Sequence, residues 1–170
     1  MTDRYVALLR GINVGGNNRI AMADLRAAFE ALGCTDVVTL LQSGNVVFTS
    51  AGFDRVELED SIAAVTGVRV RVLVLTAGTF RAIAEANPLL DIADDPSRLV
   101  TTFLETPPPA GLPSAADLAP EVVVLTDLAM YQWSPLGVSK SKIPLSYSRA
   151  LGPAATGRNQ RTVEKLLALL

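Results

Sequence analysis

The residues best suited to chemistry form a loop rich in glycine and asparagine between two arginines, Arg10 and Arg19. Its glycines allow positive φ angles and leave the backbone amides uncovered, so the loop can fold around an anion. The spacing of Gly11 and Gly16 matches a phosphate-binding P-loop, but Asn17 stands where that motif requires Lys. The glycine spacing also fails the dinucleotide-binding pattern. The loop is either an anion site of another kind or a mobile connection that needs glycine for its turns.

Three further polar segments are candidates for binding an anion. They are a predicted hairpin turn, two lysines at a predicted helix start, and an Arg-Asn pair just before the last predicted helix, whose N-terminus favours anions. Each also has a simpler interpretation: turn chemistry, snorkelling lysines beside a helix cap, and an N-cap next to a surface arginine. The candidate ligand-binding residues are Arg10, Gly11, Asn13, Gly15, Gly16, Asn17, Ser43, Asn45, Lys140, Lys142, Arg158 and Asn159.

The composition excludes several classes of enzyme. Among 170 residues there is no histidine, and Cys34 is the only cysteine. Ser-His-Asp and Cys-His nucleophile systems, and zinc centres built on Cys and His, therefore have no basis in this chain. A Ser-Lys pair at Ser141 and Lys142 would need a desolvated lysine, which two neighbouring lysines at a helix start do not favour. We predict no catalytic residue, no metal and no cofactor, and we expect Cys34 to serve as a small apolar residue.

Charge and hydropathy indicate a globular protein of the cytoplasm. Hydrophobic residues make up 49% of the chain, and no apolar run approaches the ~20 residues of a membrane span. A single cysteine and the absence of a signal-peptide pattern agree with a reducing compartment. The net charge is −2, yet residues 51–127 carry −7 and residues 128–170 carry +5. The basic C-terminal third either complements the acidic middle within the molecule or faces an anion.

The pattern of apolar residues predicts an α+β fold with two similar halves. Periodicity and turn signals in the first 75 residues predict the order β-α-β-β-α-β, which is that of a ferredoxin-like unit. We predict two ferredoxin-like subdomains joined by a helix. The N-terminal subdomain occupies 1–75, the connecting helix and loop 76–97, and the C-terminal subdomain with a terminal helix 98–170.

Local signals predict particular boundaries. Asp54 and Asn159 are expected to cap helices, and Gly33 to end one in the left-handed conformation. Further expected elements are a strand at 68–75, a short helix near 114–118 and a helix at 142–151. We also expect the loop after the first strand and the Ser-Gly-Asn turn to lie toward opposite ends of the sheet, so that they need not form one site.

A resemblance to a known family rests on residues 5–16 (YVALLRGINVGG), Met22, 42–48 (QSGNVVF), Asn87, Pro88, 137–143 and 156–159 (TGRN). These residues are similar to the signature of the domain-of-unknown-function 1697 family. The resemblance implies a cytoplasmic, mostly bacterial protein built from two ferredoxin-like halves, in a family without an established activity. The chain departs from the family at Gln160, where a Trp is usual, and so lacks an aromatic platform there.

Three functions stay open at this point. The first, which we favour, is a cytoplasmic binding protein for an anionic ligand, either a nucleotide or a nucleic acid, which uses the Gly/Asn loop and the basic C-terminal third. The second is an enzyme that acts without histidine on a small phosphorylated or carboxylated metabolite. The third is a structural or protein-interaction module. No membrane partner is expected, and the sequence does not indicate an oligomeric state.

Overall fold

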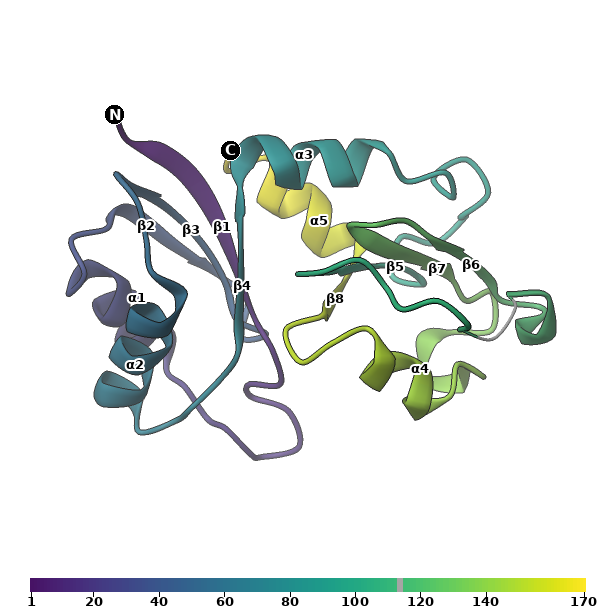
Figure 1. Cartoon of the computed structure of the whole chain (residues 1–170), viewed down its shortest axis with the longest axis horizontal. Coiled ribbons are helices and arrows are strands. Elements are labelled where there is room, and N and C mark those ends of the chain that lie inside the picture. The colour runs from purple at the N-terminus through teal and green to yellow at the C-terminus, as the bar shows by residue number, and fades with distance from the viewer. Residues whose placement is uncertain (113–114) are drawn as a thin grey trace. The chain divides into compact units, whose positions relative to one another are not determined.

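Figure 1 shows a computed structural model of the chain, which describes residues 1–112 and 115–170. The described residues form a mixed α+β structure with two four-stranded antiparallel sheets and five α-helices. The chain divides into two compact units. The first consists of Met1–Phe80 and Ala168–Leu170, and the second of Arg81–Leu167. Each unit contains one of the sheets.

The first unit contains four strands in the spatial order β2-β3-β1-β4, and all neighbouring strands are antiparallel. Its elements are β1 (Asp3–Leu9), α1 (Met22–Glu30), β2 (Thr35–Leu40), β3 (Asn45–Ser50), α2 (Arg55–Thr66) and β4 (Val72–Thr76). The helix α3 (Ala77–Glu85) follows β4 directly and continues into the second unit.

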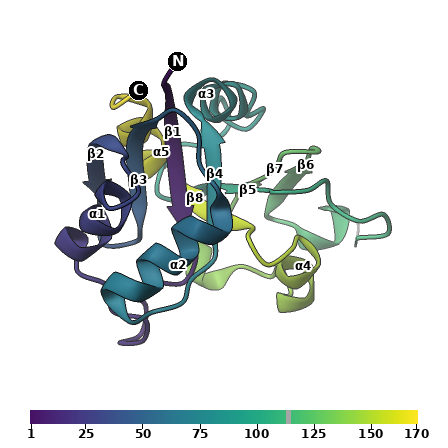
Figure 2. The ribbon, with the colours of Figure 1, turned by 60° about the vertical axis from the view of Figure 1, so that its left-hand side comes forward.

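The two helices α1 and α2 lie side by side on one face of this sheet (Figures 1 and 2). Leu25 and Phe29 of α1 and Leu58 and Ile62 of α2 are at most 1% exposed, and they pack with β1 and β3 in one core. Burial of each such side chain stabilises the fold by roughly 1.5–3 kcal/mol. The helical periodicity of apolar residues therefore corresponds to the face that covers the sheet.

Two predicted helix signals in this unit are confirmed. The Asp54 carboxylate accepts the backbone N–H groups of Val56 and Glu57, at 2.7 and 3.0 Å, and so caps α2. Gly33 follows α1 with a φ of 77°, in the left-handed conformation that ends a helix. The strand predicted at 68–75 begins only at Val72, because its partner β1 ends opposite that residue.

The second unit repeats the same strand order, as β6-β7-β5-β8, again with antiparallel neighbours. Its elements are β5 (Leu99–Phe103), the 3₁₀ turn η1 (Ala115–Leu118), β6 (Val122–Leu125), β7 (Ala129–Trp133), the 3₁₀ turn η2 (Val138–Lys140), α4 (Leu145–Ala150), β8 (Thr156–Asn159) and α5 (Gln160–Leu167). Tyr131 and Trp133 of β7 are buried.

Two predicted helices of this unit differ in extent from the structure. The helix expected at 142–151 is only α4, because Pro144 keeps extended backbone (φ −68°, ψ 150°) and the helix starts after it. The short helix expected near 114–118 is the 3₁₀ turn Ala115–Leu118, and residue 114 lies outside the described part of the chain.

Candidate functional site

The loop after β1 and the β2–β3 turn lie at the same edge of the first sheet, so the expectation that they lie toward opposite ends is wrong. The N–H of Leu9 donates to the carbonyl of Gly44 at 2.9 Å, and the Asn13 amide donates to the carbonyl of Gln42 at 2.8 Å. Both β1 and β2 run antiparallel to β3, which lies between them, so their C-terminal ends reach the same edge.

The loop between β1 and α1 is organised by its own asparagines. The Asn13 Oδ1 accepts the N–H of Ile20 at 2.9 Å, and its Nδ2 donates to the Ile20 carbonyl at 3.1 Å. Asn18 donates to the carbonyl of Gly11 at 3.1 Å. The backbone has positive φ at five positions: Gly11, Asn13, Gly15, Gly16 and Asn18. The loop thus has a defined, hydrogen-bonded conformation in which glycine and asparagine are the residues that tolerate the backbone.

A depression of about 550 Å³ lies where this loop meets the start of α1. It is lined by Asn13, Gly16, Arg19, Ile20, Ala21, Asp24 and Gln42. The N-cap residue of α1 is Ala21, which supplies no side-chain cap, so the N–H groups of the first turn are not covered by a capping oxygen. A Cβ added to Gly16 would lie 3.9 Å from Nη2 of Arg19, which places the guanidinium beside the glycine backbone. The backbone N–H groups and the guanidinium can donate hydrogen bonds to an anion, whereas the negative charge of the Asp24 carboxylate repels one.

The β2–β3 turn packs closely against the loop at Gly44. A Cβ on Gly44 would lie 2.7 Å from Cδ1 of Ile12 and 2.8 Å from Cβ of Leu9, both closer than real carbon contacts. Gly44 also has a φ of 81°. Both the space and the backbone conformation therefore require glycine here, and the turn supports one wall of the loop.

Ser43 and Asn45, the two candidate ligand-binding residues of the turn, form hydrogen bonds within the turn itself. Asn45 is fully buried, and its Nδ2 donates to the Leu40 carbonyl at 2.8 Å and to the Ser43 hydroxyl at 3.0 Å. Arg10 is half-buried at the start of the loop, and its N–H donates to the carbonyl of Arg71 at 3.1 Å. The exposed candidates of this edge are Gly11, Gly15, Gly16, Asn17 and Ser43.

In the second unit, Arg158 lies on the buried face of β8 rather than at the surface. Its side chain is opposite Thr101 of β5, is 7% exposed, and donates through Nη1 to the Thr156 hydroxyl and the Gly157 carbonyl, both at 2.8 Å. Desolvation lowers the pKa of Arg158 to about 10, because burial disfavours the charged form. Arg158 is buried because of the register in which β8 pairs with β5. The interpretation as a surface arginine did not take this register into account.

The next residue, Asn159, caps α5 as predicted. Its Oδ1 accepts both the N–H and the hydroxyl of Thr162 at 3.0 Å. Gln160, at the position where the resemblance implies a Trp, is 8% exposed, and its backbone N–H donates to the Pro96 carbonyl at 3.0 Å. The chain therefore fills this position with a buried polar residue and not with an exposed aromatic platform.

Lys140 and Lys142 lie around the 3₁₀ turn η2 and are both exposed. The Lys142 ammonium donates to the Ala119 carbonyl at 3.0 Å, and its backbone N–H donates to the carboxylate of Glu121 at 2.6 Å. Sequence reasoning missed Glu121, because a single carboxylate before a strand carries no distinctive spacing. It also missed Arg19, Asp24 and Gln42 as lining residues of the depression, although Arg19 flanks the Gly/Asn loop in the sequence.

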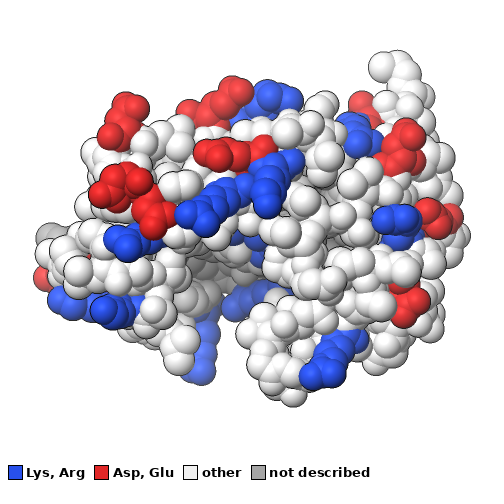
Figure 3. Space-filling model, turned by 180° about the vertical axis from the view of Figure 1, so that it is seen from behind, with Lys and Arg blue, Asp and Glu red and all other residues white. Residues whose placement is uncertain are grey.

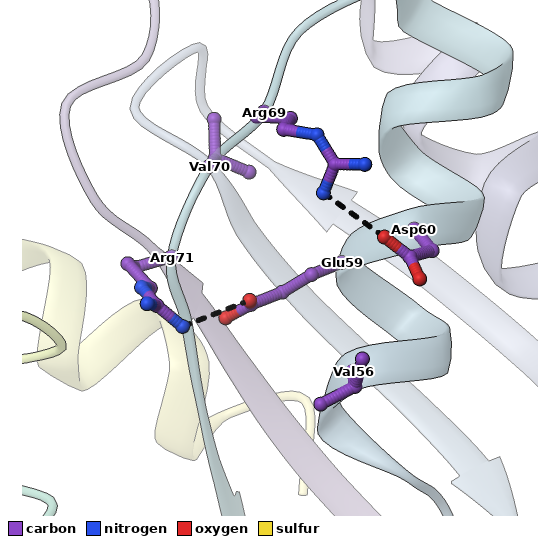
Figure 4. A pocket seen from close by; sticks show the side chains of 6 residues that line it. All are labelled: Val56, Glu59, Asp60, Arg69, Val70 and Arg71. Carbon is purple, nitrogen blue, oxygen red and sulfur yellow. Dashed lines mark hydrogen bonds and ion pairs between the residues drawn. The ribbon is translucent and has the colours of Figure 1, made fainter.

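A second cavity, of about 360 Å³, lies between α2 and the segment that enters β4 (Figure 4). Its charged side chains pair with one another across the opening: Arg71 with Glu59 at 3.3 Å, and Arg69 with Asp60 at 3.0 Å. Glu59 also accepts the N–H of Val72 at 3.1 Å. Because these arginines already have carboxylate partners, this cavity is less suited to an anion than the depression beside the loop.

On the upper part of the face seen in Figure 3, acidic and basic side chains lie close together. In the described part of the chain, no helix has the length and apolar character needed to cross a membrane. Within the same residues, no group of three or more His, Cys, Asp or Glu side chains is placed to hold a metal ion.

The candidate residues fall into two sets that the structure describes separately. Eight of them, from Arg10 to Asn45, belong to the first unit, and the four from Lys140 to Asn159 belong to the second. The first set shares one edge of its sheet.

Comparison with known proteins gives a family and a structural neighbour. No curated protein matches the chain. A solved structure titled "The structure of conserved bacterial protein SP0830 from Streptococcus pneumoniae" is similar, with a TM-score of 0.70 and 27% sequence identity, over 99% of both chains. Residues 1–131 match the model of the family described as "Protein of unknown function (DUF1697)". The chain therefore belongs to this family.

Proposed function

We propose that the protein is a binding module for an anionic ligand of nucleotide size, which occupies the depression beside the Gly/Asn loop. The carrying observation is the set of donors around this depression: the Arg19 guanidinium, the glycine backbone at Gly16 and the uncapped first turn of α1. Its volume of about 550 Å³ falls within the range of roughly 300–1,000 Å³ typical of small-molecule sites.

The arrangement favours a compact phosphate or carboxylate over a long nucleic acid. The donors converge on one concave region at a single sheet edge, and the net charge of the chain is −2. A preformed loop also lowers the conformational entropy lost on binding, because Asn13 and Asn18 already fix its backbone. The Asp24 carboxylate limits affinity for highly charged ligands, since it lies in the same first turn.

The finer architecture and the location are part of the same proposal. We assign a ferredoxin-like subdomain to 1–75, a connecting helix and loop to 76–97, and a second ferredoxin-like subdomain to 98–170, in a cytoplasmic protein. The strand order supports two related subdomains. In each sheet the strands lie in the order second, third, first, fourth, counted along the chain within that unit. This is the order that a β-α-β-β-α-β unit produces.

Isothermal titration calorimetry tests the site directly. Pyrophosphate and nucleoside monophosphates are titrated into the intact protein at low ionic strength, and each titration is repeated at high salt. Arg19→Ala is expected to weaken binding about 10-fold or more, since a charge-assisted hydrogen bond contributes roughly 1.5–3 kcal/mol. Arg26→Ala, an exposed arginine of α1 outside the depression, is the matched control and leaves the affinity unchanged.

Asp24→Asn gives an opposite and independent signal. Removal of this carboxylate from the first turn of α1 is expected to tighten binding of the same anions, because a like charge is lost. The proposal is wrong if neither probe binds at low salt. It is equally wrong if Arg19→Ala and Arg26→Ala reduce the affinity to the same extent.

A further inference from the structure

The second unit contains a buried carboxylate that holds a surface segment. Glu121 is 7% exposed, and its Oε1 accepts from Nε2 of Gln132 at 2.9 Å and from the Ser134 hydroxyl at 2.7 Å. Its Oε2 accepts the backbone N–H of Lys142 at 2.6 Å. Burial alone would raise the pKa of Glu121, but hydrogen bonds from Ser134, Lys142, Ser141 and Gln132 lower it below its ordinary value.

These contacts fix the ends of the segment that leaves β7 and leads to α4. Ser134 and Lys142 are both bonded to the same carboxylate, so residues 134–142 close a loop around Glu121. Inside the loop, the N–H of Gly137 donates to the Ser134 carbonyl at 2.9 Å, and the N–H of Lys140 donates to the Gly137 carbonyl at 3.0 Å. A buried carboxylate is costly unless its oxygens accept hydrogen bonds. Because this segment donates those hydrogen bonds to Glu121, any movement of the segment would leave the carboxylate without them, and the segment is held in one conformation.

The segment exposes aliphatic and basic side chains together. The exposed fractions are 60% for Leu136, 43% for Val138 and 74% for Leu145. Three basic residues of the same stretch, Lys140, Lys142 and Arg149, are also exposed. Between residues 128 and 170 the only acidic residue is Glu164, which belongs to α5. We call the six residues Leu136, Val138, Lys140, Lys142, Leu145 and Arg149 the 136–149 surface.

We infer that the 136–149 surface docks an acidic segment of a partner protein that also carries aliphatic side chains. Charge complementarity indicates the acidic character, because the sequence from 128 to 149 has three basic residues and no acidic one, and the nearby carboxylate of Glu121 is buried and hydrogen-bonded. The exposed leucines and valine specify the aliphatic contacts. A conformation fixed by Glu121 reduces the entropy lost on docking.

The side chains favour a protein partner over the other anionic surfaces. Single-stranded nucleic acids bind on exposed aromatic residues, whereas Tyr147, the aromatic residue of α4, is 2% exposed. Anionic membranes bind amphipathic helices that lie in the interface, but α4 has only 6 residues and the rest of the segment is turn and loop. The inference concerns the second unit and does not depend on the anion site in the first unit.

Fluorescence anisotropy with a labelled probe peptide tests this inference. The probe has about 12 residues, glutamate and leucine in alternating pairs, and a second probe replaces every leucine with serine. We expect the Glu/Leu probe to bind, with the affinity reduced about 10-fold by Leu145→Ser and by Lys140→Glu. Lys165→Glu, which reverses an exposed charge on α5, is the matched control and is expected to have little effect.

Each outcome supports the inference or overturns it. Selective loss of binding in the Leu145 and Lys140 variants supports it, as does weaker binding of the serine probe. Absence of binding up to about 1 mM overturns it, as does equal binding of the two probes. Tighter binding of single-stranded RNA or of phosphatidylserine vesicles, with the same two variants affected, also overturns it. The two tested side chains are exposed, so circular dichroism and an unchanged melting temperature separate lost docking from lost folding.

Discussion

Substitution of Gly44 by alanine provides a quantitative test of how the β2–β3 turn supports the Gly/Asn loop. The added Cβ would lie 2.7 Å from Cδ1 of Ile12 and 2.8 Å from Cβ of Leu9, and the residue has a φ of 81°. The left-handed conformation costs a non-glycine residue roughly 1–2 kcal/mol. Overpacking in a closed site adds about 1–3 kcal/mol. We therefore expect Gly44→Ala to lower the free energy of unfolding by about 2–5 kcal/mol.

Two control variants separate the two contributions to this effect. At Gly15 the φ is also positive, at 59°, but an added Cβ would meet nothing within 4 Å, so Gly15→Ala measures backbone strain alone. At Gly52 neither condition holds, and Gly52→Ala is expected to change stability by less than about 0.5 kcal/mol. Urea denaturation followed by circular dichroism gives the three values. Equal losses for Gly44→Ala and Gly15→Ala would refute the steric argument.

A double variant adds a further check. Ile12→Val removes the Cδ1 methyl that lies closest to the added Cβ. In the Gly44→Ala background this change is expected to recover part of the lost stability, although Ile12→Val alone costs roughly 0.5–1.5 kcal/mol by shortening a buried side chain. A coupling energy near zero in the double-mutant cycle would show that the Ile12 side chain does not interact with the alanine at position 44.

Three further predictions concern single side chains. Asn159→Ala removes the acceptor of the Thr162 N–H and is expected to lower the free energy of unfolding by about 1 kcal/mol, whereas Asn159→Asp, measured in the same urea titration, retains most of the cap. Because the folded-state pKa of Glu121 lies below its ordinary value of 4.5, its ionised form stabilises the fold above that pH and the contribution disappears as the pH falls through the folded pKa. Glu121→Gln is therefore expected to flatten the acid side of a stability–pH curve, and an unchanged curve would contradict this. Burial raises the pKa of the Cys34 thiol, so a thiol reagent such as iodoacetamide is expected to modify it slowly in the folded chain and rapidly in urea, with mass spectrometry as the measurement.

Features that depend on neighbouring residues alone could be predicted from the sequence. Asp54 and Asn159 cap helices as expected, because the capping acceptor and the N–H groups it binds are within three residues of each other. Phe29 of α1 and Ile62 of α2 are likewise fully buried, since an amphipathic helix must cover its apolar face, whereas Leu32 and Val65 near the helix ends are 42% exposed. The repeated order of strands and helices in the first unit follows from the same local patterns.

Features that depend on strand register and direction could not be predicted in this way. The meeting of the Gly/Asn loop with the β2–β3 turn requires the direction of two strands separated by a helix. The burial of Arg158 follows from its pairing with Thr101 across β5 and β8. Glu121 acquires its partners only when β7 places Ser134 beside it and the chain returns at Lys142. Each of these is a relation between segments that the sequence presents far apart or without a motif.

The asparagines of the resemblance motifs have a common role that changes how the candidate site is understood. The side chains of Asn13, Asn45 and Asn159 are all bonded to backbone groups, in a loop, a turn and a helix cap respectively. A side chain that fixes the backbone has fewer hydrogen-bonding positions left for a ligand. We therefore expect the ligand to be bound by the groups that the asparagines position and not by the asparagines themselves. In the first unit these groups are the glycine amides and the guanidinium of Arg19. Asn13→Ala is accordingly expected to weaken anion binding by loosening the loop, with increased backbone hydrogen exchange at 11–20, whereas Arg19→Ala weakens binding without that increase.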